Sequence, residues 1–388
     1  MRRVSFIILV AITSIVFSSC DKKLEKESNL IPIEDLFRDP EISELKISPD
    51  GSQIAFLSPI EGSMQIYVQD VATGEKVCIT EGNTHRVSNF YWKGNSKITY
   101  LMDHQGDENF VLYIVNINGT GRRQVTPTDQ VRVWVLDELR NSPNEVLIQM
   151  NARNPERFDV FKLNVLSGKM QIIAKNPGNI EKWYVDHSGE LRLAMATEGL
   201  TRILYKVQNR NFEKVLEFSF GDRVEPLIFT FDNKNIYASS NIGRDKQAIV
   251  EIDLKTGKEL DTLASSARAD VRHLEYSPKN KVLLFAKYTT WRDEYIFLDA
   301  SAEGLYDLLD SKIIGLEKKI LDHDLAEEKF IIYAYNDVNK GEYFYVDVIT
   351  EKITKIGEAC PWLNEDKMAK MEPIKFQSRD GLWVTGYL

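Results

Sequence analysis

The sequence predicts an all-β protein, a seven-bladed β-propeller of four-stranded antiparallel blades. Three observations support this: short apolar stretches bounded by turn residues, one turn signature that recurs about every 46 residues, and no helical pattern of ordinary length. A single four-stranded sheet cannot bury both of its faces, so each unit needs neighbours on either side. A period of about 46 residues is typical of propeller blades.

The first unit, residues 42–80, shows the pattern most clearly. Its first apolar stretch runs into the turn SPDG at 48–51, where proline fixes φ and glycine accepts a positive φ. Three further short strands are expected at 54–56, 65–70 and 75–80. This unit therefore reads as one complete blade.

The end of the third strand marks every repeat. Asp or Asn stands there in all copies but one, because these side chains hydrogen-bond the backbone of the turn that follows. The comparable positions are Asp70, Asn116, Asn164, Val207, Asp253, Asp299 and Asp347. Some copies are degenerate elsewhere, which leaves six or eight blades as alternatives.

Large apolar residues recur in the first strand of each unit, and we interpret them as packing between blades rather than as ligand-stacking groups. They are Leu45, Phe90, Trp134, Trp183 and Leu274. Residues 302–314 are the only helical candidate. Their periodicity is mixed, so we interpret them as an extended insertion in the sixth blade.

The first nineteen residues have the pattern of a secretory signal peptide. Arg2 and Arg3 precede an apolar run at 4–17, which as a helix would be about 21 Å long and too short to span a membrane. Residues 1–19 end immediately before Cys20, as in bacterial lipoproteins, although the position usually held by Leu is Phe17.

We therefore expect cleavage before Cys20, lipid attachment to this cysteine, and anchoring to a bacterial membrane on the periplasmic or cell-surface side. Ordinary secretion with a chance cysteine is the alternative. Residues 20–39 would then be a tether and lead-in, and 40–360 the propeller.

The two other cysteines, Cys78 and Cys360, are interpreted as separate thiols, with a disulfide as the alternative in an exported protein. The net charge is −9, and no basic stripe is present. A nucleic-acid partner is therefore not expected.

The last residues break the repeat. Residues 371–388 read MEPIKFQSRDGLWVTGYL, with alternating apolar residues on both sides of the tight turn RDG. This pattern predicts a β-hairpin that starts a new sheet. We therefore expect residues 361–388 to be a linker and the start of a further domain that continues beyond Leu388.

These features together carry a family resemblance. SPDGSQIAF followed by IYVQDVATG resembles the TolB-like propeller repeat, a relative of WD40. With LIPIEDLF at 30–37 and EPIKFQSRDGLWVTGYL at 372–388, the mature chain resembles the prolyl oligopeptidase family of serine peptidases, in its acylaminoacyl-peptidase and dipeptidyl-peptidase-like branch. The resemblance implies that the final hairpin opens an α/β-hydrolase domain. It also implies that the propeller caps a Ser-Asp-His site and limits substrates to short peptides.

No catalytic residue can be assigned within the chain. The nucleophile elbow of such an enzyme is G-x-S-x-G, and the sequence contains none. The serine, aspartate and histidine would lie beyond Leu388, so we expect this chain alone to be inactive as a peptidase. Its substrate-binding residues stay unassigned.

Other polar candidates are interpreted as turn residues, and no metal or cofactor is predicted. The resemblance suggests the pair Glu327 and Glu328 as a clamp for the amino terminus of a substrate. One acid cluster is Asp103, His104, Asp107 and Glu108, and a second is Asp322, His323 and Asp324. The other candidates are the histidines His85, His187 and His273 and the glycosylation sequon at Asn118.

Two functions from different classes therefore remain. The first is the propeller portion of an exported serine peptidase that acts on short peptides. The second is a non-enzymatic, lipid-anchored propeller that binds a peptide, glycan or protein partner. The sequence that follows Leu388 would distinguish them.

Overall fold

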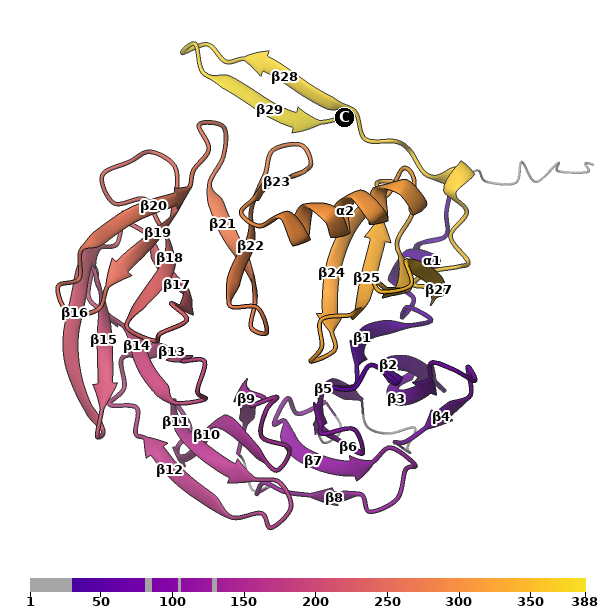
Figure 1. Cartoon of the computed structure of the whole chain (residues 1–388), viewed down its shortest axis with the longest axis horizontal. Coiled ribbons are helices and arrows are strands. Elements are labelled where there is room, and N and C mark those ends of the chain that lie inside the picture. Colours follow the sequence, from indigo (N-terminus) through magenta and orange to yellow (C-terminus); the bar gives the residue numbers. More distant parts are fainter. Residues whose placement is uncertain (1–29, 81–85, 104–105, 128–130) are drawn as a thin grey trace, which may run out of the picture.

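The computed structural model describes residues 30–80, 86–103, 106–127 and 131–388. In this part of the chain seven antiparallel sheets, each built from consecutive strands, form a ring (Figure 1). The predicted seven-bladed β-propeller is confirmed. The expected signal peptide and Cys20 lie outside the described residues.

In each blade the first strand is innermost and the last lies at the rim (Figure 1). The first three blades consist of β1 (Ser43–Ile47), β2 (Gln53–Ile60), β3 (Ser63–Asp70) and β4 (Lys76–Cys78); β5 (Val87–Lys93), β6 (Lys97–Met102), β7 (Val111–Asn116) and β8 (Arg123–Gln124); and β9 (Val133–Asp137), β10 (Glu145–Asn154), β11 (Arg157–Asn164) and β12 (Met170–Ala174).

The fourth, fifth and seventh blades consist of β13 (Ile180–Val185), β14 (Leu191–Glu198), β15 (Thr201–Gln208) and β16 (Asn211–Ser219); β17 (Val224–Phe229), β18 (Asn235–Ser240), β19 (Ala248–Asp253) and β20 (Glu259–Ala264); and β24 (Glu317–His323), β25 (Lys329–Tyr335), β26 (Glu342–Asp347) and β27 (Lys352–Glu358). A short helix α1 (Ile33–Phe37) precedes the ring, and η1 (Glu365–Lys367) follows it. No helix in the described residues has the length and apolar character that crossing a membrane requires.

The sixth blade departs from the prediction of four strands. It has only β21 (Val271–Ser277), β22 (Val282–Thr289) and β23 (Asp293–Phe297), and helix α2 (Ala300–Lys312) follows where the fourth strand would stand. The interpretation of residues 302–314 as a non-helical insertion was therefore wrong.

The repeat itself explains how this helix starts. Asp299, the turn residue of the sixth unit, caps α2, and its Oδ1 accepts a hydrogen bond from the Ser301 N–H at 2.9 Å. The apolar side chains of α2 are divided between two cores, with Tyr306 in one and Leu309 in the other. For this reason the sequence shows no single apolar stripe.

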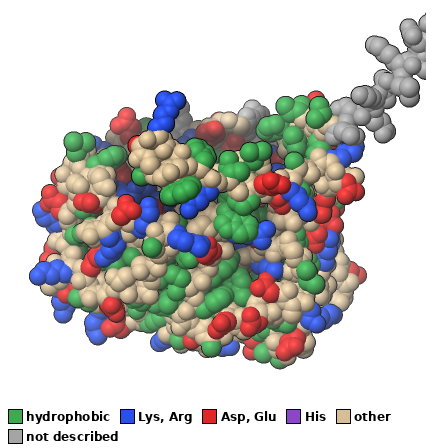
Figure 2. Space-filling view, turned by 90° about the horizontal axis from the view of Figure 1, so that it is seen from above, with side chains coloured by type: hydrophobic (Ala, Val, Ile, Leu, Met, Phe, Trp, Pro, Cys, Tyr) green, Lys and Arg blue, Asp and Glu red, His purple; other side chains and the backbone are tan. Residues whose placement is uncertain are grey.

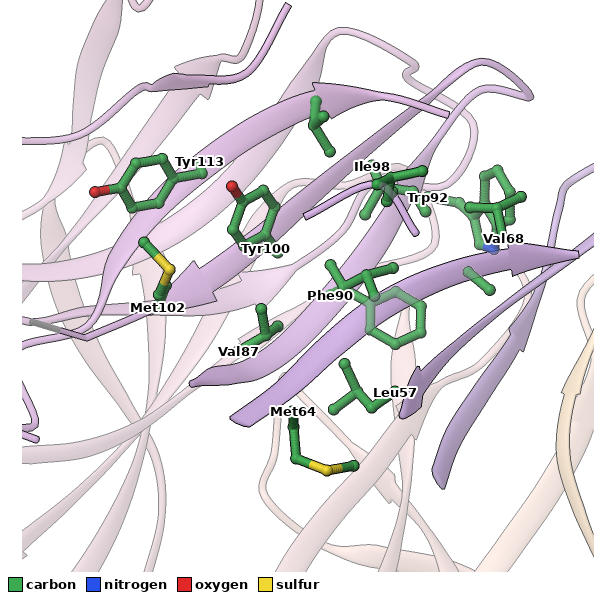
Figure 3. Close-up of a cluster of buried hydrophobic side chains, with 14 of the residues drawn as sticks. Leu57, Met64, Val68, Val87, Phe90, Trp92, Ile98, Tyr100, Met102 and Tyr113 are labelled. Atoms are coloured by element: carbon green, nitrogen blue, oxygen red, sulfur yellow. The ribbon is translucent and has the colours of Figure 1, made fainter. Parts of the chain in front are cut away.

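Apolar cores fill the spaces between neighbouring blades, as the large residues of the first strands predict. Between the first and second blades, Phe90 and Tyr100 are fully buried among side chains from both sheets (Figure 3). The predicted packing role is confirmed for Leu45, Phe90, Trp183 and Leu274, which are all buried.

Trp134 is the exception, since its side chain is 41% exposed. Side chains alternate along a strand, and here Val133 and Val135 pack into the core. Trp134 contacts the Phe110 ring instead, with 5.9 Å between the ring centroids. Its predicted place in the core was wrong.

The ring closes without a strand shared between the first and last blades. Two backbone hydrogen bonds join these blades, from the Glu41 N–H to the Ala359 carbonyl at 2.8 Å and from the Leu325 N–H to the Pro49 carbonyl at 2.9 Å. A common core that includes Ile47 completes the contact. Closure therefore depends on packing rather than on an interlaced sheet.

Cys78 and Cys360 are not joined by a disulfide, so the interpretation as separate thiols is confirmed. Cys78 ends the rim strand β4, and its Sγ donates to the Thr80 carbonyl at 3.0 Å. Cys360 packs against the core that joins the first and last blades. The alternative of a disulfide is not realised.

The two sides of the ring differ. Because the strands of a blade are antiparallel, the turns after each first strand lie on one side and the loops after each second strand lie on the other. We call the side with the turns at Pro49 and Glu327 the turn face. We call the side with the loop at Trp291 the hairpin face.

The predicted terminal hairpin is present as β28 (Pro373–Gln377) and β29 (Trp383–Tyr387). It lies outside the ring beside β23 and α2 (Figure 1), where the Tyr387 hydroxyl donates to the Trp291 carbonyl at 2.8 Å. The described side chains on the side seen in Figure 2 mix both charge signs with apolar groups.

Candidate functional site

The centre of the ring holds a cavity of about 430 Å³. The first strands of the first, second, third and seventh blades supply most of its wall. Its charged lining residues include Glu44, Lys46, Asp137, Glu138, Arg140 and Asp322. The central channel is therefore polar and carries both signs of charge.

Arg140 connects opposite parts of this channel. It follows β9 in the third blade, and its Nη1 lies 3.1 Å from Oδ1 of Asp322 at the end of β24 in the seventh blade. Its Nη2 donates to the His323 carbonyl at 2.7 Å. The other oxygen of Asp322 accepts the Ile47 N–H at 2.9 Å, so three blades meet at this point. The contacts narrow the channel on the turn face.

Lys46 and Glu138 lie on the same wall, and burial affects them in opposite ways. Burial lowers the pKa of Lys46, whose Nζ donates to the Phe90 carbonyl at 2.6 Å and lies 4.3 Å from the Tyr91 ring centroid. Burial raises the pKa of Glu138. Both groups are thus held in a desolvated part of the wall.

Lys93 anchors the loop that carries Arg140. Its Nζ donates to the carbonyls of Glu138 and Glu145, the second at 2.6 Å, and the residue is only 2% exposed. Burial lowers the pKa of Lys93 to about 8. These contacts fix the loop that aims Arg140 across the channel.

Three rings from the fourth, fifth and sixth blades meet on the turn face. The His187 ring stacks on Phe231 with 5.4 Å between centroids and meets the edge of Tyr276 at 5.5 Å. His187 Nε2 also lies 2.9 Å from the Phe229 carbonyl. On the turn face, blades are therefore joined on both sides of the channel, by the Arg140–Asp322 pair on one side and by these three rings on the other.

The predicted polar candidates do not form a reaction centre with these residues. Glu327 lies in the turn after β24, where Oε1 accepts the Lys279 N–H at 2.9 Å and Oε2 accepts the Ser277 hydroxyl. Because this turn belongs to the turn face, Glu327 and Glu328 lie on the side opposite to the terminal hairpin.

The described histidines have partners other than serine. His187 faces a carbonyl, His273 Nε2 lies 3.3 Å from Glu275, and His323 Nδ1 lies 2.8 Å from the Asp324 carbonyl. His85 and His104 lie outside the described residues. Within the described ranges, no group of three or more His, Cys, Asp or Glu side chains could hold a metal ion.

The remaining sequence candidates occupy turns. The Asn118 side chain accepts the Thr120 hydroxyl at 2.7 Å in the connection between β7 and β8. The Asp107 side chain accepts the Asn109 N–H at 2.9 Å. Both patterns are typical of side chains that stabilise turns.

Sequence reasoning missed Lys46, Lys93 and Arg140. Lys93 gave one signal, because it directly follows the aromatic residues at 90–92 at the end of β5, whereas Lys46 takes the ordinary polar position between Leu45 and Ile47 in β1. Arg140 gave no comparable signal, since its partner stands 182 residues further on and the meeting of the third and seventh blades is a property of the closed ring.

Two known peptidases are similar in sequence to this chain. The chain is 25% identical to dipeptidyl aminopeptidase BIII of Pseudoxanthomonas mexicana over 368 residues, which are 93% of this chain and 53% of that protein. It is 21% identical to dipeptidyl peptidase family member 6 of Caenorhabditis elegans, over 93% of this chain and 51% of that protein. The chain is a homologue of dipeptidyl peptidases.

The chain spans about half the length of these two relatives. Among solved structures, prolyl oligopeptidase B from Galerina marginata superposes with a TM-score of 0.62 at 11% identity, covering 91% of this chain and 56% of that one. The propeller thus has the fold found in prolyl oligopeptidases. The resemblance to dipeptidyl peptidases seen in the sequence is confirmed by the two curated relatives. No family model matches the sequence.

Proposed function

We propose that this chain is the propeller portion of an exported serine peptidase that acts on short peptides. The observation that carries the proposal is the similarity to dipeptidyl peptidases over 93% of the chain. In this proposal the nucleophile, the acid and the base belong to sequence beyond Leu388. The chain alone is then inactive as a peptidase.

The terminal hairpin supports a hydrolase domain on the hairpin face. Phe376 is 52% and Trp383 61% exposed, and a two-stranded hairpin with such side chains is marginal without further packing. Tyr387 places this hairpin against the hairpin face. A domain that starts with these strands would cover the same end of the channel.

The channel then acts as a filter for substrates. Its turn-face end is narrowed by Arg140 and Asp322, and its wall is fixed by buried lysines rather than by mobile loops. Only short, flexible peptides would pass such an opening. Lipid on Cys20 would hold the enzyme at a bacterial membrane.

The experiment compares this chain with the complete reading frame that contains it. Each is tested for hydrolysis of dipeptidyl nitroanilides and for labelling by a fluorophosphonate probe. We expect neither reaction from residues 20–388 alone, and both from a longer frame that contains G-x-S-x-G followed by Asp and His. A frame that stops at Leu388, or a longer frame without labelling, would favour the binding propeller instead.

A further inference from the structure

A second cavity lies between the sixth and seventh blades, where the sixth blade lacks its fourth strand. Its volume is about 290 Å³, near the lower end of the range for small-molecule sites. Helix α2 forms one side and the two sheets form the others. The apolar part of its wall includes Leu284, Leu305, Leu308, Ile320, Phe330 and Val348.

This cavity opens on the turn face, away from the terminal hairpin. Glu327 stands in the turn after the first strand of the seventh blade, and Glu351 in the turn after its third strand. Asn280, in the first turn of the sixth blade, completes this rim. The site is therefore separate from the side on which the proposed hydrolase domain would sit.

The polar groups of this cavity mainly accept hydrogen bonds. Glu275, Glu327 and Glu351 line it, and none of its described lining residues is a lysine or an arginine. Glu275 Oε2 lies 3.3 Å from Nε2 of His273. The His323 Nδ1 faces the Asp324 carbonyl, so in the neutral ring Nε2 is an acceptor.

The helix leaves the cavity open. Gly304 lines it beside Leu305 and Leu308, although glycine inside a helix is less favourable than alanine. A Cβ placed on Gly304 would meet no atom within 4 Å, so packing does not require glycine there. The helix N-terminus is already capped by Asp299 and offers no free anion site.

We propose that this cavity binds a small hydrophobic amine. A single ring or a short alkyl chain fits between the leucines and Phe330, and the ammonium group meets the glutamates at the rim. A carboxylate or phosphate would find no basic partner in the wall. A neutral apolar molecule would gain no charge interaction from the glutamates.

The experiment uses 2-phenylethylamine as the probe and 2-phenylethanol as its neutral counterpart. Binding to residues 20–388 is measured by isothermal titration and by ligand-observed NMR at pH 7. We expect saturable binding of the amine, at least about tenfold tighter than that of the alcohol.

Variants locate the site. Gly304→Leu should abolish binding, because the new side chain enters the cavity, while its higher helix propensity preserves folding. Glu303→Leu is the matched control, since it adds the same side chain to the same helix about 100° away from Gly304. It should bind as the parent protein does. Glu275→Gln should weaken amine binding about tenfold and leave alcohol binding unchanged.

Three results would each overturn the proposal: no saturable amine binding, equal affinities for the amine and the alcohol, or unchanged binding by Gly304→Leu. Circular dichroism and thermal unfolding of each variant show whether the fold is intact. Peptidase activity is not read, so failure here leaves the proposed function untouched.

Discussion

Arg140 of the third blade and Asp322 of the seventh blade form an ion pair across the central channel, with 3.1 Å between Nη1 and Oδ1. The two side chains are 24% and 17% exposed. Asp322 also receives the Ile47 N–H, and Arg140 also donates to a carbonyl of the seventh blade. One arginine thus ties together blades that are not neighbours in the ring.

Replacing Arg140 by alanine should destabilise the ring. The change leaves a partly buried Asp322 without its positive partner and removes a charged hydrogen bond, which is worth about 2 kcal/mol. Urea unfolding followed by tryptophan fluorescence measures the loss. Lys234→Ala removes an ion pair of two exposed side chains and should change nothing measurable. Equal midpoints for the two variants would show that the cross-channel pair is not stabilising.

Lys93 should give the protein a distinctive dependence on alkaline pH. Burial lowers its pKa to about 8 in the folded state, whereas the unfolded value is near 10.5. Below pH 8 both states carry the charge. Between these values the unfolded state binds more protons, so the free energy of unfolding rises with pH, by up to about 1.4 kcal/mol per unit.

Urea unfolding between pH 7 and 9.5 tests this dependence, with Lys93→Met as the comparison. The upper limit avoids the range in which buried tyrosines such as Tyr91, with a pKa raised to about 12, lower the stability instead. The difference between parent and variant should change with pH in this window. A constant difference would mean that Lys93 does not titrate there.

The Tyr387 hydroxyl should hold the terminal hairpin to the ring. Tyr387→Phe removes its hydrogen bond to the Trp291 carbonyl. Hydrogen exchange of the amides in β28 and β29 should then become faster, with the ring unaffected. Tyr288→Phe is the control, because it removes a hydroxyl that bonds Glu294 within the sixth blade. Faster exchange in both variants would point to a general loosening.

Cys20 should be the site of lipid attachment. In a bacterial host, radiolabelled palmitate should enter the protein, and Cys20→Ala should abolish the labelling, because the thiol is the acceptor. Cys78→Ala serves as the control and should label as the parent does. Equal labelling of Cys20→Ala would exclude the anchor and leave ordinary secretion.

Much of the fold could be predicted because each blade of a propeller is specified by residues that are close together in the sequence. Each turn Asp or Asn bonds the next few backbone amides, as Asp70 does with Thr73 at 2.8 Å, so blade boundaries are visible in the sequence. The same local logic failed at Asp299, whose side chain also accepts a nearby backbone N–H, that of Ser301, but starts a helix instead of a turn. At Asp299 the helix that follows packs its apolar side chains into two cores.

Much less of the candidate site could be predicted. Contacts such as Arg140 with Asp322 depend on which blades face each other once the ring has closed, and no spacing encodes that. Trp134 is a second example. Its apolar ring predicted burial, but its neighbours Val133 and Val135 pack into the core instead. The cavity beside α2 could not be predicted either, because the absence of a fourth strand leaves no motif in the sequence.

The seam between the first and last blades has a mechanical consequence. Every blade is a continuous piece of chain, and the ends of the ring meet only through packing and a few hydrogen bonds. Tension applied through the two ends should therefore part this seam before any sheet is pulled apart. The remaining blades would then come off one after another from either end, each as a separate step in force.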